Sequence, residues 1–502
     1  MSEQIELHST RNEVDKTFVG FSPNGGSIKP VHIAGGAQRV IYGKIYKSNH
    51  IKRMALVMSQ KGVTPKGNST EEIHDFLKEI EAIEDSDAIT DTDLEALRNT
   101  MQKLLSTDKG VFIDKSLSDN MVTFTAGSKY FITGKSMYED IGEFIGLVLC
   151  KYCSDLTNYI NNLLEKGNDP ITHLFAPILE DDNTEIYNSK IKPIEEIPAF
   201  GDNSDSMKEF INGLKASSSC LMKNLKNHPN SLTQLRIFNL YCIIQLIRYM
   251  SMLESFYCGS TPNPILLDFS GSTPSKSSIA RASEMSYTQM YKSINRFYTF
   301  AYAKLLNQRY TKEELFDSQT PVYEKPKDKN NSKPPKNTTE ELTTLWDIAK
   351  ERASQQTNSE EIFSIFGETI YDMLALEATS NPVVCLRALG TGAGFLYPPN
   401  QPNKRFVPSQ DIIETILKSC VEPDESVSST EIRERLWNRF NIIIGGSSFE
   451  TEKLKASNAI MQIDEDALED NFTAFEQLLE AMDFAEIMAD GILQIRFGGV
   501  SE

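Results

Sequence analysis

The pattern of residues 409–502 constrains the fold of this chain more than any other feature. Three apolar stripes come first, and two short apolar runs around Asp490-Gly491 close the pattern. In each stripe the apolar residues recur at the i, i+3, i+4 spacing of a helix with one buried face. Asp-Gly between apolar runs predicts a hairpin, because a type I′ turn needs positive φ at both central residues. Three helices followed by a hairpin predict a winged helix.

The residues behind this prediction divide into three stripes and one outgoing strand. The second stripe follows Ser428-x-x-Glu431, a capping box in which side chains satisfy the free backbone N–H groups of a helix start. The stripes are Ile412, Ile413, Ile416, Leu417 and Cys420; Ile432, Leu436, Trp437 and Phe440; and Phe472, Phe475, Leu478, Leu479 and Met482. In the strand, Leu493, Ile495 and Phe497 alternate with polar residues. An unrelated α+β tail with the same element order is the alternative.

The third of these helices has the wrong charge for DNA. It contains no Lys or Arg, and its acidic residues are Asp464, Glu465, Asp466, Glu469, Asp470, Glu476, Glu480 and Asp483. Basic side chains supply most of the affinity of a helix that enters a DNA groove, so this helix would be repelled. Glu476, Glu480 and Asp483 lie beyond the first turn and gain nothing from the helix dipole. We expect these three to face a basic protein partner; an ordinary solubilising surface is the alternative.

Composition limits the class of protein. A chain of 502 residues is long enough for about two to four domains, and 40% hydrophobic with 24% charged residues is typical of soluble globular proteins. The net charge of −19 does not favour attraction to nucleic acid or to an anionic membrane. Seven scattered cysteines, no signal peptide and no long apolar run predict a cytoplasmic protein without a membrane contact.

The predicted fold class is mainly α and multidomain, with a small β-containing N-terminal region, a helical middle and a C-terminal winged helix. Gly, aromatic and β-branched residues predict short strands and turns in the basic region 1–68, and similar runs predict strands within 111–133. The expected divisions are 1–68; an α-rich domain with a few strands over 69–323; a Lys/Pro linker or loop over 324–338; a helical segment over 339–400; and an acidic winged helix over 404–502.

The N-terminal region is the one candidate for nucleic-acid contact. Cations interleave with aromatic side chains there, and such a surface can bind phosphates and stack bases. The cations are Arg39, Lys44, Lys47, Lys52 and Arg53. A solvated β domain, or an electrostatic contact with the acidic remainder of the chain or with an acidic partner, is the alternative.

A second candidate site resembles a phosphate-binding loop. An apolar run ends at Phe269, and the loop from Ser270 to Ser277 leads into a helix, with Gly271 and Lys276 inside it. Serines replace both glycines of the pattern, although those glycines let backbone N–H groups point at a phosphate. The alternative is a Ser-rich helix entry in which hydroxyls cap free N–H groups. No motif names a reaction, and we expect no cofactor, metal or catalytic residue.

Two runs resemble a known group of proteins. These are Gly394-Phe395-Leu396-Tyr397-Pro398, continued by Lys404 to Pro408, and the segment from Arg439 to Gly446. They resemble the C-terminal region of poorly characterised proteins of bacterial multigene anti-phage defence loci. The resemblance contains no catalytic motif, so no functional residue is carried over. It implies a cytoplasmic bacterial protein that works with partner ATPases or nucleases.

Three functions follow from these observations. The first is a non-catalytic adaptor or scaffold subunit of a multiprotein complex, with the acidic winged helix as its docking domain. The second is a nucleic-acid-binding protein that uses the basic N-terminal region. The third is a divergent nucleotide-dependent enzyme with Lys276 as the phosphate cation.

Overall fold

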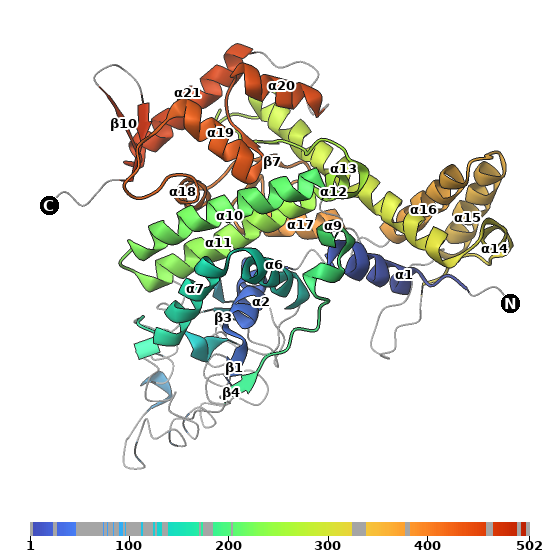
Figure 1. Ribbon diagram of the computed structural model, residues 1–502, viewed down its shortest axis with the longest axis horizontal. Helices are drawn as coiled ribbons and strands as arrows, with labels where there is room; N and C mark the ends of the chain where they lie inside the picture. Colours follow the sequence, from blue (N-terminus) through green and yellow to red (C-terminus); the bar gives the residue numbers. More distant parts are fainter. Residues whose placement is uncertain are drawn as a thin grey trace.

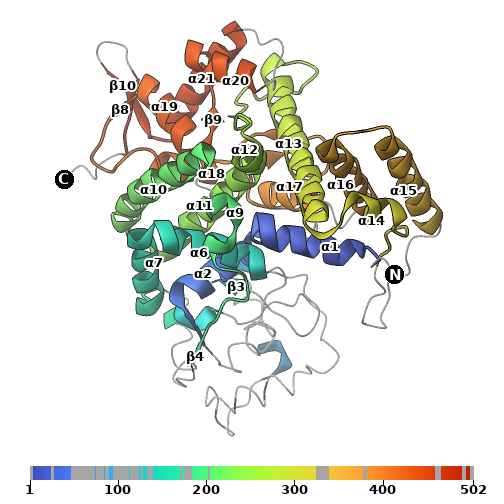
Figure 2. The same ribbon diagram turned by 45° about the vertical axis from the view of Figure 1, so that its right-hand side comes forward.

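The protein is mainly α-helical, as the sequence predicts. In the computed structural model the helices surround a central pair, with N-terminal elements below this pair and C-terminal elements above it (Figure 1). The same grouping is visible after a turn of 45° (Figure 2). The described residues are 4–23, 28–46, 128–132, 139–169, 184–201, 204–323, 338–376, 382–457, 465–488 and 493–497, with short pieces between 74 and 125 and at 172–173.

The central pair consists of α10 (Asp205–Lys226) and α11 (Ser231–Ser251). Side-chain oxygens of Ser204 and Asn230 accept backbone N–H groups at the two helix starts, which are otherwise without partners. Side chains are buried on every face of α11, including polar ones such as that of Arg248. A helix buried all round lies at the centre of a fold rather than on its surface.

The N-terminal region is helical where the sequence predicted short strands and turns. α1 (Leu7–Val14) continues into a π-helical turn (Asp15–Val19), and α2 spans Pro30–Tyr42. The prediction of a β-containing region is therefore wrong for these residues. Among the described residues of 1–68, only β1 (Lys44–Tyr46) is a strand, and it pairs with β4 (Thr184–Ile186).

A close helix crossing explains this difference. α2 approaches α6 (Glu139–Tyr152) so closely that a Cβ on Gly36 would lie 2.6 Å from the Cα of Gly142. Glycine in a helix interior costs about 1 kcal/mol relative to Ala, so local preference argues against a helix here. The two glycines allow the backbones to touch, and this packing outweighs the local preference.

The strands predicted within 111–133 are only partly present. β2 (Phe112–Ile113) pairs antiparallel with β3 (Phe124–Thr125), whereas Lys129–Phe131 forms a 3₁₀ turn instead of a strand. The elements that follow α6 up to the central pair are α7 (Ser154–Lys166), β4, a 3₁₀ turn (Ile194–Glu196) and α9 (Pro198–Gly201).

A long helix, α13 (Ser278–Arg309), extends from the C-terminal side of the molecule to a helical group at the right of Figure 1. A Cβ on Gly367 would lie 2.6 Å from the backbone nitrogen of Ala303, so α16 lies close against α13. Of the expected linker 324–338, only Thr338 is described, as the first residue of α15. The other helices of this part are α12 (Leu253–Cys258), α14 (Lys312–Asp317), α15 (Thr338–Ser354), α16 (Ser359–Ala375) and α17 (Pro382–Gly392).

Short strands connect the middle of the chain with its C-terminal part. β5 (Ile265–Leu266) pairs in parallel with β9 (Ile442–Ile443). β6 (Leu396–Tyr397) and β7 (Arg405–Phe406) form an antiparallel pair, and a single parallel bridge joins Phe406 to the residue after β5. These contacts hold segments together that lie far apart in the sequence.

The predicted C-terminal elements occur in the order that the sequence predicts, with additions between them. The three predicted helices and the two hairpin strands are present, whereas α20 and the short strands β8 and β9 were not predicted. β11 lies between β10 and β8, and both pairings are antiparallel. The elements are α18 (Gln410–Lys418), β8 (Val427–Ser428), α19 (Ser429–Phe440), β9, α20 (Ser448–Ala456), α21 (Glu465–Ala481), β10 (Ala485–Ile487) and β11 (Leu493–Ile495).

One cluster of buried apolar side chains extends through the molecule, from Ile5 near the N-terminus to Ile495 in β11. A smaller cluster around Leu266, Ile443 and Leu468 lies where β5, β9 and α21 meet. The domain boundaries expected from the sequence stay predictions. Among the described helices, none is long and apolar enough to cross a membrane.

Candidate functional site

The candidate site lies in the C-terminal unit, defined here as residues 404–497, and centres on α21. The frame of this unit begins with α19, where the hydroxyl of Ser428 accepts the N–H of Glu431 at 3.3 Å. Of the predicted stripe, Ile432, Leu436 and Phe440 are buried, and Trp437 is half-buried. The prediction of an amphipathic helix behind a capping serine is therefore confirmed.

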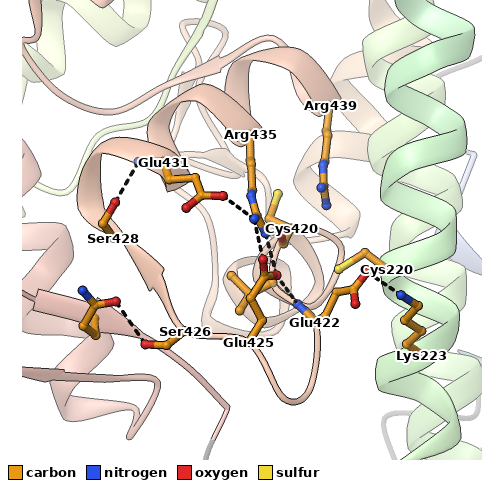
Figure 3. Close-up of polar contacts among 12 residues, drawn as sticks. Cys220, Lys223, Cys420, Glu422, Glu425, Ser426, Ser428, Glu431, Arg435 and Arg439 are labelled. Atoms are coloured by element: carbon orange, nitrogen blue, oxygen red, sulfur yellow. Dashed lines mark hydrogen bonds and ion pairs between the residues drawn. The ribbon is translucent and has the colours of Figure 1, made fainter.

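A charged cluster joins α19 to the loop that precedes β8 (Figure 3). The guanidinium of Arg435 donates to both carboxylate oxygens of Glu425, at 2.6 and 2.7 Å. It also donates to the carbonyl of Cys420 at 2.7 Å and to the carboxylate of Glu431. The hydrogen bonds from Arg435 lower the pKa of Glu425 to about 2. Paired, bidentate contacts of this kind are the strong ones among exposed charges.

Polar contacts with α10 hold the C-terminal unit against the central pair (Figure 3). The Asn224 amide donates to the carbonyls of Lys418 and Val421, at 2.8 and 2.7 Å. The ammonium of Lys223 lies 2.6 Å from a carboxylate oxygen of Glu422. The Asn224 amide is buried, so water does not compete for its hydrogen bonds, whereas the pair of Lys223 with Glu422 is partly exposed. The buried bonds of Asn224 to backbone carbonyls therefore help to set the position of the unit.

The inner face of α21 packs against the central part of the chain. Asn471 is buried, and its amide group donates to the carbonyls of Leu267 and Ile444, at 2.9 and 2.7 Å. Its side-chain oxygen accepts the N–H of Phe269 at 2.8 Å. One side chain therefore satisfies backbone groups at the carboxyl ends of both parallel strands, β5 and β9. Further along α21, the ring of Phe475 packs on that of Phe269.

The outer face of α21 is acidic. Five acidic residues of the helix are exposed: Glu465, Asp466, Glu469, Asp470 and Glu480. Glu476 is only half-buried; burial raises its pKa, Arg433 opposes this shift, and neighbouring carboxylates add to it. Asp483 follows the helix in a left-handed conformation and is exposed. Two of the three residues predicted to meet a partner, Glu480 and Asp483, are therefore accessible, and Glu476 is partly so.

The basic N-terminal residues do not form one surface. Arg39 is fully buried, 3.9 Å from a carboxylate oxygen of Glu143, so it has no surface to offer a phosphate. Lys44 is exposed in β1. Lys47, Lys52 and Arg53 lie outside the described residues. Contact with nucleic acid through the other four cations stays a prediction.

The loop from Ser270 to Ser277 uses most of its polar groups within itself and at the start of α13. The hydroxyl of Ser270 donates to Asp268, and Ser277 accepts the N–H of Ala280, as expected for a serine-rich helix entry. Gly271 adopts a φ of +62°, and Lys276 is exposed. Asn471 covers the ends of the parallel strands beside this loop, and nucleotide binding through Lys276 stays a prediction.

The sequence contains a helix-start motif for α20, although this helix was not among the predicted elements. Ser447-x-x-Glu450 is a capping box, and in the structure each of the two side chains bonds the other residue's backbone N–H. Glu450 is buried and also accepts the N–H of Gly445 at 3.2 Å. The contacts of Asn471, in contrast, had no local signal, because its partners are far away in the sequence.

Among known proteins, no family model, no curated protein and no solved structure matches the chain.

Proposed function

We propose that this protein is a non-catalytic adaptor or scaffold subunit of a multiprotein complex, and that its C-terminal unit is a winged helix that binds a basic protein partner. The observation that carries the proposal is the two-sided character of α21. One face is buried against the rest of the chain. The exposed face has acidic residues and no cation of its own, and Arg433 of α19 lies 3.8 Å from Glu469.

The winged-helix assignment is supported by the order and pairing of the elements. A winged helix contains a helix, a strand, two helices and two strands, and its last strand pairs with both other strands. In this chain α18, β8, α19, α21, β10 and β11 follow that order, and β11 lies between β10 and β8. α20 is then an addition between the second and third helices.

The docking role is supported by what a DNA-binding third helix would need. Such a helix inserts one free face into the major groove and neutralises phosphates with Lys and Arg. Here Asn471 and Phe475 use part of α21 for contacts with β5 and the loop behind it. The remaining face would repel phosphates and attract Lys or Arg side chains of a protein.

The setting of the complex follows from the resemblance of the 394–408 and 439–446 segments to proteins of bacterial multigene anti-phage defence loci. We propose that the partners are other subunits encoded there, ATPases or nucleases, in the cytoplasm. Any reaction of the complex would be catalysed by those partners.

The test is affinity purification of the tagged full-length protein from its native host. Charge reversal by Asp470→Lys with Glu480→Lys should leave folding intact, because both side chains are exposed, and should remove the partner. Asp347→Lys with Glu351→Lys makes the same charge change on exposed positions of α15, at another end of the molecule (Figure 1). This control should retain the partner.

Two outcomes would overturn the proposal. A wild-type protein that purifies without any stoichiometric partner is not an adaptor. If both double variants retain the partner equally, the acidic face of α21 is not the docking surface.

A further inference from the structure

A pocket of about 590 Å³ lies where three distant parts of the chain meet. Its wall is formed by the start of α2, by the outer side of α17, and by the loop between β6 and β7. The volume is in the range of pockets that hold small molecules. The pocket is separate from α21 and shares no residue with the docking surface proposed above.

The charge of this pocket is opposite to that of the whole chain. Lys29, Arg387 and Lys404 line it, and none of the lining residues is acidic. The chain as a whole has a net charge of −19. α2 begins at Pro30, also in the wall, so the positive end of its dipole adds to the same field. Cations gathered in a concave site favour an anionic ligand.

Lys404 is the most buried of these cations, with 2% of its surface exposed. Its ammonium donates to the carbonyls of Pro398 and Pro399, the latter at 3.0 Å. A lysine ammonium has three N–H donors, so one is left over for a ligand. Burial lowers the pKa of Lys404, and the nearby charge of Arg387 lowers it further. A bound anion would relieve both effects.

Two polar groups of the lining residues have no protein partner in the described part of the chain. Arg387 is half-buried, and in the described ranges of the chain it has no hydrogen bond and no ion pair. The hydroxyl oxygen of Thr391, one helical turn further along α17, is buried and has no hydrogen-bond partner there either. The guanidinium of Arg387 is therefore available to an anion in the pocket.

We propose that this pocket binds the phosphate group of a small molecule. The planar guanidinium of Arg387 can donate two parallel hydrogen bonds to phosphate oxygens, and Lys404 supplies a fixed point charge. A ligand bound in this way would link the start of α2 to α17 and to the β6–β7 loop.

The experiment is isothermal titration calorimetry of the full-length protein with inorganic phosphate, with ADP and with adenosine. Phosphate and ADP should bind, and adenosine should not. Arg387→Gln should weaken binding roughly tenfold to a hundredfold, the loss expected for a charge-assisted pair. Lys455→Gln removes an exposed cation from α20, which does not line the pocket, and should leave the dissociation constant unchanged.

The unliganded variants provide a second readout. Because Arg387 makes no hydrogen bond or ion pair in the described residues, Arg387→Gln should melt at the same temperature as the wild type or higher. In the presence of phosphate or ADP, only the proteins with Arg387 should gain thermal stability. The proposal is overturned if neither phosphate nor ADP binds at millimolar concentration, or if Arg387→Gln binds as tightly as the wild type.

Discussion

The carboxylate of Glu425 should stabilise the C-terminal unit through its contacts with Arg435 (Figure 3). Arg435 holds this carboxylate with two hydrogen bonds and lowers its pKa from 4.5 to about 2. At about 1.36 kcal/mol per pKa unit, the upper limit is roughly 3.4 kcal/mol. The Glu425 side chain is 32% exposed, so water screens the pair. We therefore expect Glu425→Gln to lower the free energy of unfolding by about 1–2 kcal/mol.

The pH dependence follows from the direction of the shift. A carboxyl group whose pKa is lower in the folded state stabilises that state above its unfolded pKa, and the contribution is lost as the pH falls toward the folded pKa. For Glu425 this means a constant difference between variant and wild type near neutral pH. The difference should shrink below a pH of about 4.5 and continue to shrink toward about 2.

The assay is urea unfolding followed by tryptophan fluorescence. Trp437 lies in α19, two residues from Arg435, and the second tryptophan, Trp346, can be replaced by Phe in all proteins compared. Glu422→Gln is the control, because the pair of Glu422 with Lys223 is half-exposed and should contribute less than about 1 kcal/mol. An equal loss in both variants, or a Glu425→Gln loss that does not diminish at acidic pH, would refute the reasoning.

Two further substitutions test the packing. Gly36→Ala places a Cβ against the backbone of Gly142, so it should lower the melting temperature through an overpacking cost of about 1–3 kcal/mol. Gly201→Ala is the control: its Cβ would have no atom nearer than 3.9 Å, so the melting temperature should not fall. Asn471→Leu leaves the buried carbonyl of Leu267 unpaired, so we expect a loss of about 2–4 kcal/mol and faster hydrogen exchange in α21; unchanged exchange would contradict this role of Asn471.

The sequence predicted the C-terminal elements well because their signals are local. The Ser428 cap, the apolar stripe behind it and the paired strands β10 and β11 all depend on residues a few positions apart. The N-terminal prediction failed for the opposite reason. Gly36 favours a turn in isolation and is accepted in a helix only because Gly142, far along the chain, lies against it.

The same distinction applies to function. The acidic face of α21 could be predicted because all its residues lie on one helix. The anion pocket could not, because Lys29, Arg387 and Lys404 come from three segments that only the complete fold brings together. The burial of Arg39 was equally invisible, since a basic residue among aromatic ones looks the same on a surface and in a core.

The parallel pairing of β5 with β9 has a consequence for how the chain acquires its structure during synthesis. At typical translation rates, Ile443 leaves the ribosome on the order of 10–35 s after Leu266. During that interval β5 has no β9 to pair with, and the backbone groups that Asn471 later satisfies have no such partner. The nascent chain therefore keeps these backbone groups without their native partners until its C-terminal unit has been synthesised.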